Sequence, residues 1–228
     1  MCTNNNSLIK LVDLHKTYRV GTELVRALRG ITLDIAANEY VAIMGPSGSG
    51  KSTLMNILGC LDVPTGGEYH LRGNDVAKLS QSKLARIRGR QIGFVFQTFE
   101  LLPRTTALKN VQLPLMYTQA THKRQRALAA LERVGLADRA KHRPNQLSGG
   151  QKQRVAMARA LVQEPDIILA DEPTGELDTE TGNQILGLLQ ELKEKNQKTE
   201  IIVTHDRRVG TIADRILRIE DGQITTNK

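Results

Sequence analysis

Apolar and polar residues alternate along several short segments early in the chain. Leu8–Leu14, Ile31–Ile35 and Glu68–Leu71 follow this two-residue period, which predicts strands with one face in the core and one in water. Later segments differ, because apolar runs there alternate with stretches whose apolar residues recur every three to four positions, as in amphipathic helices. The change of period predicts an α/β fold that carries an additional antiparallel sheet.

Four apolar runs are short and continuous. They are Tyr40–Met44, Ile92–Phe96, Asp166–Ala170 and Thr199–Val203, and we predict a strand for each. The last two have the composition of strands buried on both faces, as a parallel sheet under helices requires. Ligands of such sheets bind at the carboxyl ends of the strands, so residues that directly follow these runs are candidates for a functional site.

The helical period dominates between residues 105 and 161. We predict a helical subdomain, placed at approximately 98–163 within a single domain that covers residues 8–228. The basic segment His122–Arg126 opens one of its helices; it is best interpreted as a solvated helix face, with contact to nucleic acid or lipid head groups as the alternative. The polar residues 1–7 predict a disordered tail.

Composition narrows the class of protein. The chain has 228 residues, 39% of them hydrophobic, which suits one sizeable core. A formal charge of +8 indicates anionic partners such as nucleotides, nucleic acid or a membrane surface. Cys2 and Cys60 form no disulfide framework, and a reducing compartment is expected. The N-terminus lacks the apolar core of a secretory signal, and no apolar run reaches the ~18 residues that span a bilayer, so a transport role would need a second polypeptide.

A glycine-rich loop follows the first of the continuous apolar runs. Its residues are Gly45, Pro46, Ser47, Gly48, Ser49, Gly50, Lys51, Ser52 and Thr53. This pattern is typical of a phosphate-binding loop, in which glycines let backbone amides close around phosphate oxygens, Lys51 neutralises charge and the Ser52 hydroxyl reaches Mg²⁺. A simple glycine-rich linker is the alternative, but the strand before the loop and the helix predicted from Ser52 onwards favour an anion site.

A second motif, Leu147-Ser148-Gly149-Gly150-Gln151, precedes a predicted helix. Ser148 is a good N-cap, and a plain helix start explains that residue on its own. It does not explain the paired glycines Gly149 and Gly150, which expose amides where a side chain would block a phosphate. Both motifs therefore predict the same ligand, a nucleoside triphosphate.

Hydrolysis of a triphosphate needs a metal, a base that orients water, and donors to the phosphoryl oxygens. Asp171 and Glu172 end one predicted strand; we predict that Asp171 holds Mg²⁺ and that Glu172 is the general base. Gln97 follows another strand and could ligate Mg²⁺ and contact the attacking water, whereas His205 could donate to the γ-phosphate. Each of these residues could instead have a purely structural role, such as a surface position or a contact with a helix N-terminus. The predicted phosphate loop nearby favours the functional interpretation.

Aromatic residues make up 3% of the chain, and Tyr18 precedes the strand that leads to the phosphate loop. We predict that its ring stacks on adenine, with a half-buried tyrosine on a small sheet as the alternative. The other histidines lack placement at a strand end and are interpreted as ordinary surface residues; they are His15, His70, His122 and His142.

These motifs occur in an order that resembles the ATP-binding subunits of ABC transporters, over residues 8–225. The set comprises Gly45–Thr53, Gln97, Leu147–Gln151, Ile167–Glu172, Gly175-Glu176-Leu177-Asp178 and His205. In that family these are the Walker A loop, Q-loop, signature motif, Walker B strand, D-loop and H-loop. The resemblance implies a P-loop NTPase fold with a RecA-like parallel-sheet core, an antiparallel β-subdomain and an α-helical signature subdomain.

The resemblance also implies a mechanism. Two copies would pack head to tail as a homodimer in the ATP-bound state, with ATP and Mg²⁺ between them. Residues that would act in trans on the partner's ATP are Ser148, Gly149, Gly150, Gln151 and Asp178. A separate transmembrane permease would dock along Gln97–Pro114, so the subunit would be cytoplasmic and peripheral on the inner face of the cell membrane.

Further segments are similar to MacB-type macrolide exporters and LolD-type lipoprotein-release ATPases, namely Asn56–Asp62, Phe99–Pro103 and Asp171–Gly175. Those systems allow a periplasmic adaptor. Glu176, where Asn is common, and a short Tyr117–Arg126 segment depart from the pattern, and neither is expected to touch the chemistry. The alternatives are a division-type ATPase that only transmits force, a soluble ATPase acting on nucleic acid and a non-hydrolysing scaffold; we expect no nucleic-acid partner.

Overall fold

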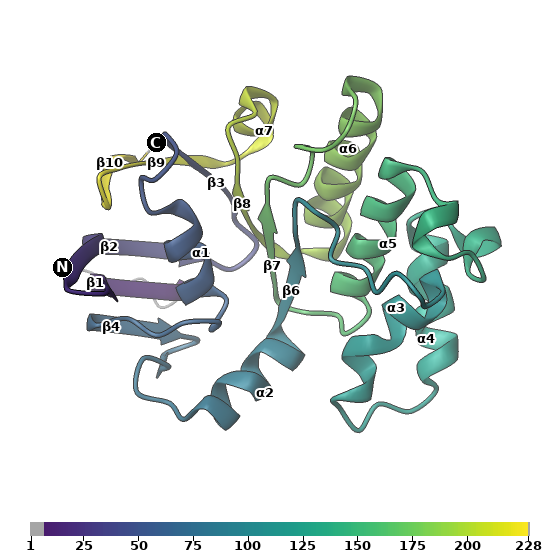
Figure 1. Ribbon diagram of the computed structural model, residues 1–228, viewed down its shortest axis with the longest axis horizontal. Coiled ribbons are helices and arrows are strands. Elements are labelled where there is room, and N and C mark those ends of the chain that lie inside the picture. Colours follow the sequence, from purple (N-terminus) through teal and green to yellow (C-terminus); the bar gives the residue numbers. More distant parts are fainter. Residues whose placement is uncertain (1–6, 228) are drawn as a thin grey trace.

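Two β-sheets organise the computed structural model, which describes residues 7–227 (Figure 1). The antiparallel sheet has the strand order β2-β1-β4-β5, and the central sheet has the order β10-β9-β3-β8-β7-β6. The strands are β1 (Ser7–Val20), β2 (Glu23–Ala36), β3 (Tyr40–Met44), β4 (Gly66–Leu71), β5 (Asn74–Asp75), β6 (Ile92–Val95), β7 (Ile167–Asp171), β8 (Thr199–Val203), β9 (Arg215–Glu220) and β10 (Gln223–Asn227). The predicted mixture of a parallel and an antiparallel sheet is confirmed.

Strands β3, β6, β7, β8 and β9 pair in parallel, and β10 returns antiparallel to β9. Their side chains alternate between two hydrophobic cores. Val41 and Ile43 of β3 belong to the core shared with the antiparallel sheet, whereas Tyr40 and Ala42 belong to the core under the helices. Because both faces of the sheet are covered at β3, that strand is apolar at every position.

The helices lie on both sides of the central sheet. They are α1 (Lys51–Leu58), α2 (Gln81–Gln91), α3 (Ala107–Met116), α4 (Lys123–Arg133), α5 (Gly149–Leu161), α6 (Thr179–Asn196) and α7 (Arg207–Ile212), with single turns η1 (Ala137–Arg139) and η2 (Pro144–Gln146). Helix α1 lies between the two sheets, and α3, α4 and α5 gather on the far side of the central sheet (Figure 1). The signature helix α5 and the phosphate-loop helix α1 are thus separated by the sheet.

Some boundaries differ from the sequence prediction. Strand β1 extends to Val20, beyond the predicted Leu14, because irregularities in its pairing with β2 let the hairpin twist and continue. Of the predicted tail over residues 1–7, residues 1–6 lie outside the described part of the chain, and Ser7 is the first residue of β1. Within residues 7–227, no helix has the length and apolar character needed to cross a membrane.

A buried carboxyl group lies near the start of β8, beside the start of β3. This edge of the central sheet is opposite the edge where the parallel strands end. Glu200 of β8 is fully buried beside Tyr40 of β3, and neither its oxygens nor the Tyr40 hydroxyl has a hydrogen-bond partner among the described residues. Burial raises the pKa of Glu200 to about 8, with the nearby Lys193, itself bonded to Asp214, opposing the rise. The group is therefore protonated in the folded protein at neutral pH.

We expect Glu200→Gln to stabilise the protein at alkaline pH. The folded pKa of Glu200 lies above its ordinary value, so folding takes up a proton between about pH 4.5 and 8, and the free energy of unfolding falls through this window. A neutral amide removes that loss, on the order of 5 kcal/mol. Thermal unfolding at pH 5 and pH 9 measures the effect, and an equal stability change at both pH values would contradict it.

Candidate functional site

The phosphate loop runs from the end of β3 into α1 and depends on glycine at two close approaches. Gly45 has φ 153°, and a Cβ atom there would lie 2.0 Å from the Ile219 carbonyl oxygen of β9. Gly50 has φ 105°, and a Cβ atom there would lie 2.6 Å from the Ala27 carbonyl oxygen of β2. Larger residues would push the loop away from both sheets. The glycines thus hold the loop against both sheets while its amides remain available.

Lys51 lies in the loop that it is predicted to serve. Its ammonium donates to the carbonyl oxygens of Gly45 at 2.9 Å and Pro46 at 2.7 Å. The Ser49 hydroxyl is buried and has no partner among the described residues. An unpartnered buried hydroxyl and an ammonium bonded only to carbonyls suit a phosphate, whose oxygens would accept from both groups.

Glu172 and His205 contact each other at the edge of the central sheet where the parallel strands end. Glu172 follows β7 with the left-handed φ of 44°, held by a hydrogen bond from its amide to the Val203 carbonyl at 2.8 Å. Its Oε1 lies 2.7 Å from His205 Nδ1, and its Oε2 accepts from the Thr204 hydroxyl at 3.0 Å. The strained backbone therefore aims the carboxylate at residues that follow β8.

Asp171 lies at the end of the same strand and is half-buried. Its pKa is raised by burial and by the neighbouring Glu172 carboxylate, while the charge of Lys51 opposes the rise. A carboxylate in these surroundings would be relieved of repulsion by a bound cation. The Ser52 hydroxyl, the Gln97 amide oxygen and the Asp171 carboxylate are hard oxygen donors of the kind Mg²⁺ uses, so the residues present fit that ion.

Gln97 follows β6 but contacts a residue that was expected to be remote from the chemistry. Its Nε2 donates to Glu176 Oε1 at 3.2 Å. A Cβ atom on Gly175 would lie 3.1 Å from the same amide nitrogen, so the segment after Glu172 packs directly on Gln97. Glu176, which was expected not to touch the chemistry, therefore contacts a predicted site residue, because the turn after β7 brings its side chain back to β6.

Tyr18 is tied to its surroundings through both its hydroxyl and its ring. The hydroxyl donates to Asp62 Oδ2 at 2.8 Å, and the Lys16 ammonium lies 4.8 Å from the ring centroid. Burial and the Asp62 carboxylate raise the pKa of the tyrosine. Burial also acts to raise the pKa of Asp62, but hydrogen bonds from Lys16 and Tyr18 give a net lowering. The phenol ring is thus fixed in orientation, as a stacking platform requires.

The signature segment begins α5 as a capping box. The Ser148 hydroxyl accepts from the Gln151 amide at 3.3 Å, and the Gln151 side chain accepts from the Ser148 amide at 3.0 Å. Gly150 is buried, and a Cβ atom there would lie 2.1 Å from Thr181 Cγ2 of α6. Packing against α6 is therefore a second reason for this glycine, besides the exposure of amides that its sequence suggested.

Asp178 caps the neighbouring helix. Its carboxylate accepts from the Thr181 amide at 2.9 Å and from the Thr181 hydroxyl at 2.6 Å, and these hydrogen bonds lower its pKa. The signature segment and Asp178 thus meet at Thr181. Among residues 7–227, no hydrogen bond or ion pair joins the signature segment to the phosphate loop of the same chain; the central sheet separates them (Figure 1).

Sequence reasoning missed several partners of the predicted residues. Thr204 and Asp62 hold Glu172 and Tyr18, and Thr181 joins the signature segment to Asp178. Thr204 directly follows a buried strand and precedes His205. The rule that selected the other site residues, their position after a predicted strand, could therefore have selected it too. Asp62 and Thr181 gave no comparable signal, because their contacts depend on how separate elements pack.

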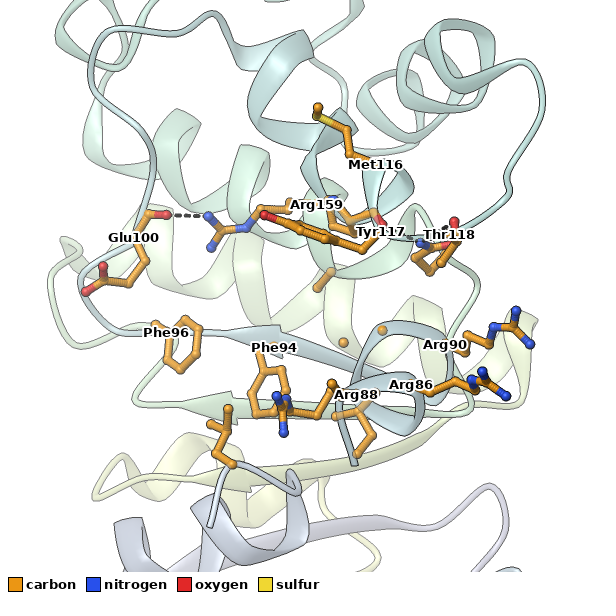
Figure 2. A pocket seen from close by; sticks show the side chains of 18 of the residues that line it. Arg86, Arg88, Arg90, Phe94, Phe96, Glu100, Met116, Tyr117, Thr118 and Arg159 are labelled. Atoms are coloured by element: carbon orange, nitrogen blue, oxygen red, sulfur yellow. Dashed lines mark hydrogen bonds between the residues drawn. The ribbon is translucent and has the colours of Figure 1, made fainter. Parts of the chain in front are cut away.

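A groove of about 1160 Å³ lies between α2, β6 and the ends of α3 and α5 (Figure 2). Phe94 of β6 and Phe96, just after that strand, line it with stacked rings whose centroids are 5.6 Å apart. Met116 and Tyr117 line it from the end of α3 and are 66% and 86% exposed. Large apolar side chains that are this accessible and lie next to each other are candidates for an interaction surface.

The chain is similar over most of its length to known proteins. A family model described as ABC transporter matches residues 28–175, more than half of the chain. The uncharacterized ABC transporter ATP-binding protein YvrO of Bacillus subtilis is 55% identical over 97% of both chains. The macrolide export ATP-binding/permease protein MacB of Brucella melitensis is 54% identical over 96% of this chain, which spans 34% of that relative's length.

A solved structure is also similar over nearly the whole chain. It is the dimeric post-hydrolysis state of the ATP-binding cassette MJ0796, from Methanocaldococcus jannaschii, bound to ADP and Pi. It matches with a TM-score of 0.90 and 47% identity, over 96% of this chain and 97% of that one. The chain belongs to the ABC transporter family, and its fold is that of the family's ATP-binding, ATP-hydrolysing domains.

Proposed function

We propose that this chain binds Mg-ATP in its phosphate loop and hydrolyses it with Glu172 as the general base. The observation that carries this assignment is the Glu172 carboxylate, held at the end of β7 by His205 and Thr204 and electrostatically close to Asp171. Mg²⁺, held by Ser52, Gln97 and Asp171, would neutralise charge on the β- and γ-phosphates. Tyr18 would stack on the adenine ring.

The residues divide the reaction between them. Lys51 leaves the carbonyls of Gly45 and Pro46 to bind phosphate oxygens. Glu172 accepts a proton from a water whose oxygen bonds to the γ-phosphorus, while the bond from that phosphorus to the bridging oxygen of ADP breaks. His205 is 79% exposed at its side chain, so it can leave Glu172 and donate to the γ-phosphate, which frees the carboxylate for the water.

A second copy would complete the site. In this proposal Ser148, Gly149, Gly150 and Gln151 of one protomer bind the γ-phosphate held by the other, and Asp178 lies at the seam. The separation of the signature segment from its own phosphate loop supports this arrangement, as does the dimeric state of the MJ0796 cassette. We assign residues 98–163 to a helical subdomain that carries the signature segment when the pair closes.

The proposed partner is a separate transmembrane permease of the MacB or LolD type. The apolar groove between β6 and the end of α3 supports a docked permease segment, and the matched MacB relatives are named as ATP-binding/permease proteins. ATP-driven closure would then pull on the permease, for export or for extraction of a lipid or lipoprotein. The subunit would lie on the cytoplasmic face of the membrane, with a periplasmic adaptor as a further component.

A photo-crosslinking amino acid at Tyr117 tests the partner. We expect an adduct between this groove position and an integral membrane protein that has few membrane-spanning helices and a large domain outside the cytoplasm. The same crosslinker at Thr211, on α7 away from α2 and the groove (Figure 1), is the control and should give no such adduct. An adduct with a ribosomal or DNA-binding protein would instead favour a soluble ATPase that acts on nucleic acid.

A division-type ATPase is the second candidate, because it would use the same ATP site and a membrane partner without moving a substrate. The identity of the crosslinked membrane protein separates the two: a cell-wall regulator favours division, and a transport channel or extraction complex favours the MacB or LolD type.

A further inference from the structure

One arginine connects the wall of the groove to the signature helix. Arg159 lies near the end of α5, the helix that begins with the signature segment, and it lines the groove. Its guanidinium donates to the carbonyl oxygens of Phe99, at 2.9 Å, and of Glu100. Figure 2 shows the side chain reaching across to Glu100. Two N–H groups of one guanidinium therefore join α5 to the segment that follows Gln97.

The two acceptor residues have unusual backbones. Phe99 has φ 61° and Glu100 has φ 48°, the left-handed region that residues with side chains rarely adopt. Two such residues in succession persist only where other contacts hold them. Arg159 supplies those contacts, and burial lowers its pKa, so the guanidinium itself depends on these carbonyl acceptors.

A comparable contact lies on the other wall of the groove. Arg88 of α2 donates to the Cys60 carbonyl oxygen at 2.6 Å. Cys60, at the end of the phosphate-loop helix α1, also has a left-handed backbone, with φ 53°. Arg86 and Arg90, which flank Arg88 on the same helix, make no hydrogen bond or ion pair among residues 7–227. Each wall of the groove is thus tied by one arginine to a helix that begins at a nucleotide-binding motif.

We propose that Arg159 is a positioning residue that couples the groove to hydrolysis. By holding Phe99 and Glu100 against α5, it makes Gln97 and the signature segment move together when the groove changes shape. The inference rests on the proposed ATPase function, and the same contact would carry a change at Gln97 on ATP binding to the groove. The contact lies away from Lys51, so its loss should slow turnover and leave ATP affinity unchanged.

Arg159→Met tests the coupling, because methionine keeps much of the apolar stem and removes the donors. We expect kcat for ATP to fall about tenfold, with KM changed less than about twofold. Arg159→Lys, which keeps a charged donor, should recover part of the loss. Arg124→Met is the matched control on the exposed surface of α4 and should leave both constants unchanged.

A fluorescent reporter separates coupling from a merely structural role. The chain contains no tryptophan, so Tyr117→Trp places a single fluorophore on the rim of the groove. We expect Mg-ATP to shift its emission in the parent and in Arg124→Met, and not in Arg159→Met. If Arg159→Met does not fold, Arg159→Lys carries the test with a reduced shift at an unchanged unfolding midpoint.

Three results for Arg159→Met would overturn the coupling. The first is an unchanged kcat, and the second is a full emission shift with Mg-ATP. The third is a joint loss of kcat, affinity and thermal stability that Arg159→Lys does not rescue. The proposed ATPase function fails separately, if the parent protein hydrolyses no ATP.

Discussion

Glu172→Gln is expected to lower ATP hydrolysis by about two to four orders of magnitude, the usual contribution of a positioned general base. ATP should still bind, because Lys51 and the loop amides are untouched. The amide is isosteric and can still accept from the Thr204 hydroxyl, as Oε2 of Glu172 does at 3.0 Å, so the fold should be unaffected. Single-turnover phosphate release measures the loss, and Glu132→Gln on the exposed face of α4 is the matched control.

The same variant tests the second copy. Once hydrolysis is blocked, bound ATP should hold two protomers together, and sedimentation at saturating Mg-ATP should show a dimer. A variant that turns over ATP at nearly the normal rate would remove Glu172 from the role of base. A monomer at saturating ATP would argue against completion of the site in trans.

Lys51→Ala should abolish nucleotide binding at ordinary ATP concentrations. The Lys51 ammonium is the cation of the phosphate loop, and in this structure it bonds to the Gly45 and Pro46 carbonyls at 2.9 and 2.7 Å. Hydrogen bonds to charged groups contribute about 1.5–3 kcal/mol each. Loss of two such contacts to phosphate oxygens would weaken binding about 100-fold or more.

Isothermal titration of Mg-ATP measures this affinity. Lys10→Ala, on the exposed face of β1, removes the same charge elsewhere and should leave the affinity unchanged. Equal affinities for Lys51→Ala and the parent would place the phosphates somewhere other than the glycine-rich loop.

Most elements of the fold could be predicted because their patterns are local. Tyr40–Met44 and Thr199–Val203 are buried on both faces, so their apolar runs coincide with β3 and β8. The β1–β2 hairpin was underestimated, because its outer half is stabilised by pairing between strands and carries exposed residues such as Leu24. The local hydrophobic pattern predicts buried strands. It does not predict exposed strand segments that are stabilised by pairing with a neighbouring strand.

The site could be predicted as a set of motifs but not as a set of contacts. The order of elements places Asp171, Glu172 and His205 at one edge of the sheet, as expected. The hydrogen bond from Gln97 to Glu176 and the fork of Arg159 depend on turns with left-handed residues. Such backbones at non-glycine positions have no sequence signal, because tertiary contacts impose them.

The phosphate loop is also hydrogen-bonded to the β9–β10 hairpin, which lies near the other end of the sequence. Gly222, in the β9–β10 turn, donates from its amide to the Ser49 carbonyl at 2.9 Å, and its own carbonyl accepts from the Arg29 amide at 2.9 Å. A ribosome synthesises this turn after every helix and nearly every strand, and a domain generally folds as a unit. During synthesis, the hydrogen bond that holds the Ser49 carbonyl can therefore form only after the rest of the phosphate loop and its helix have been made.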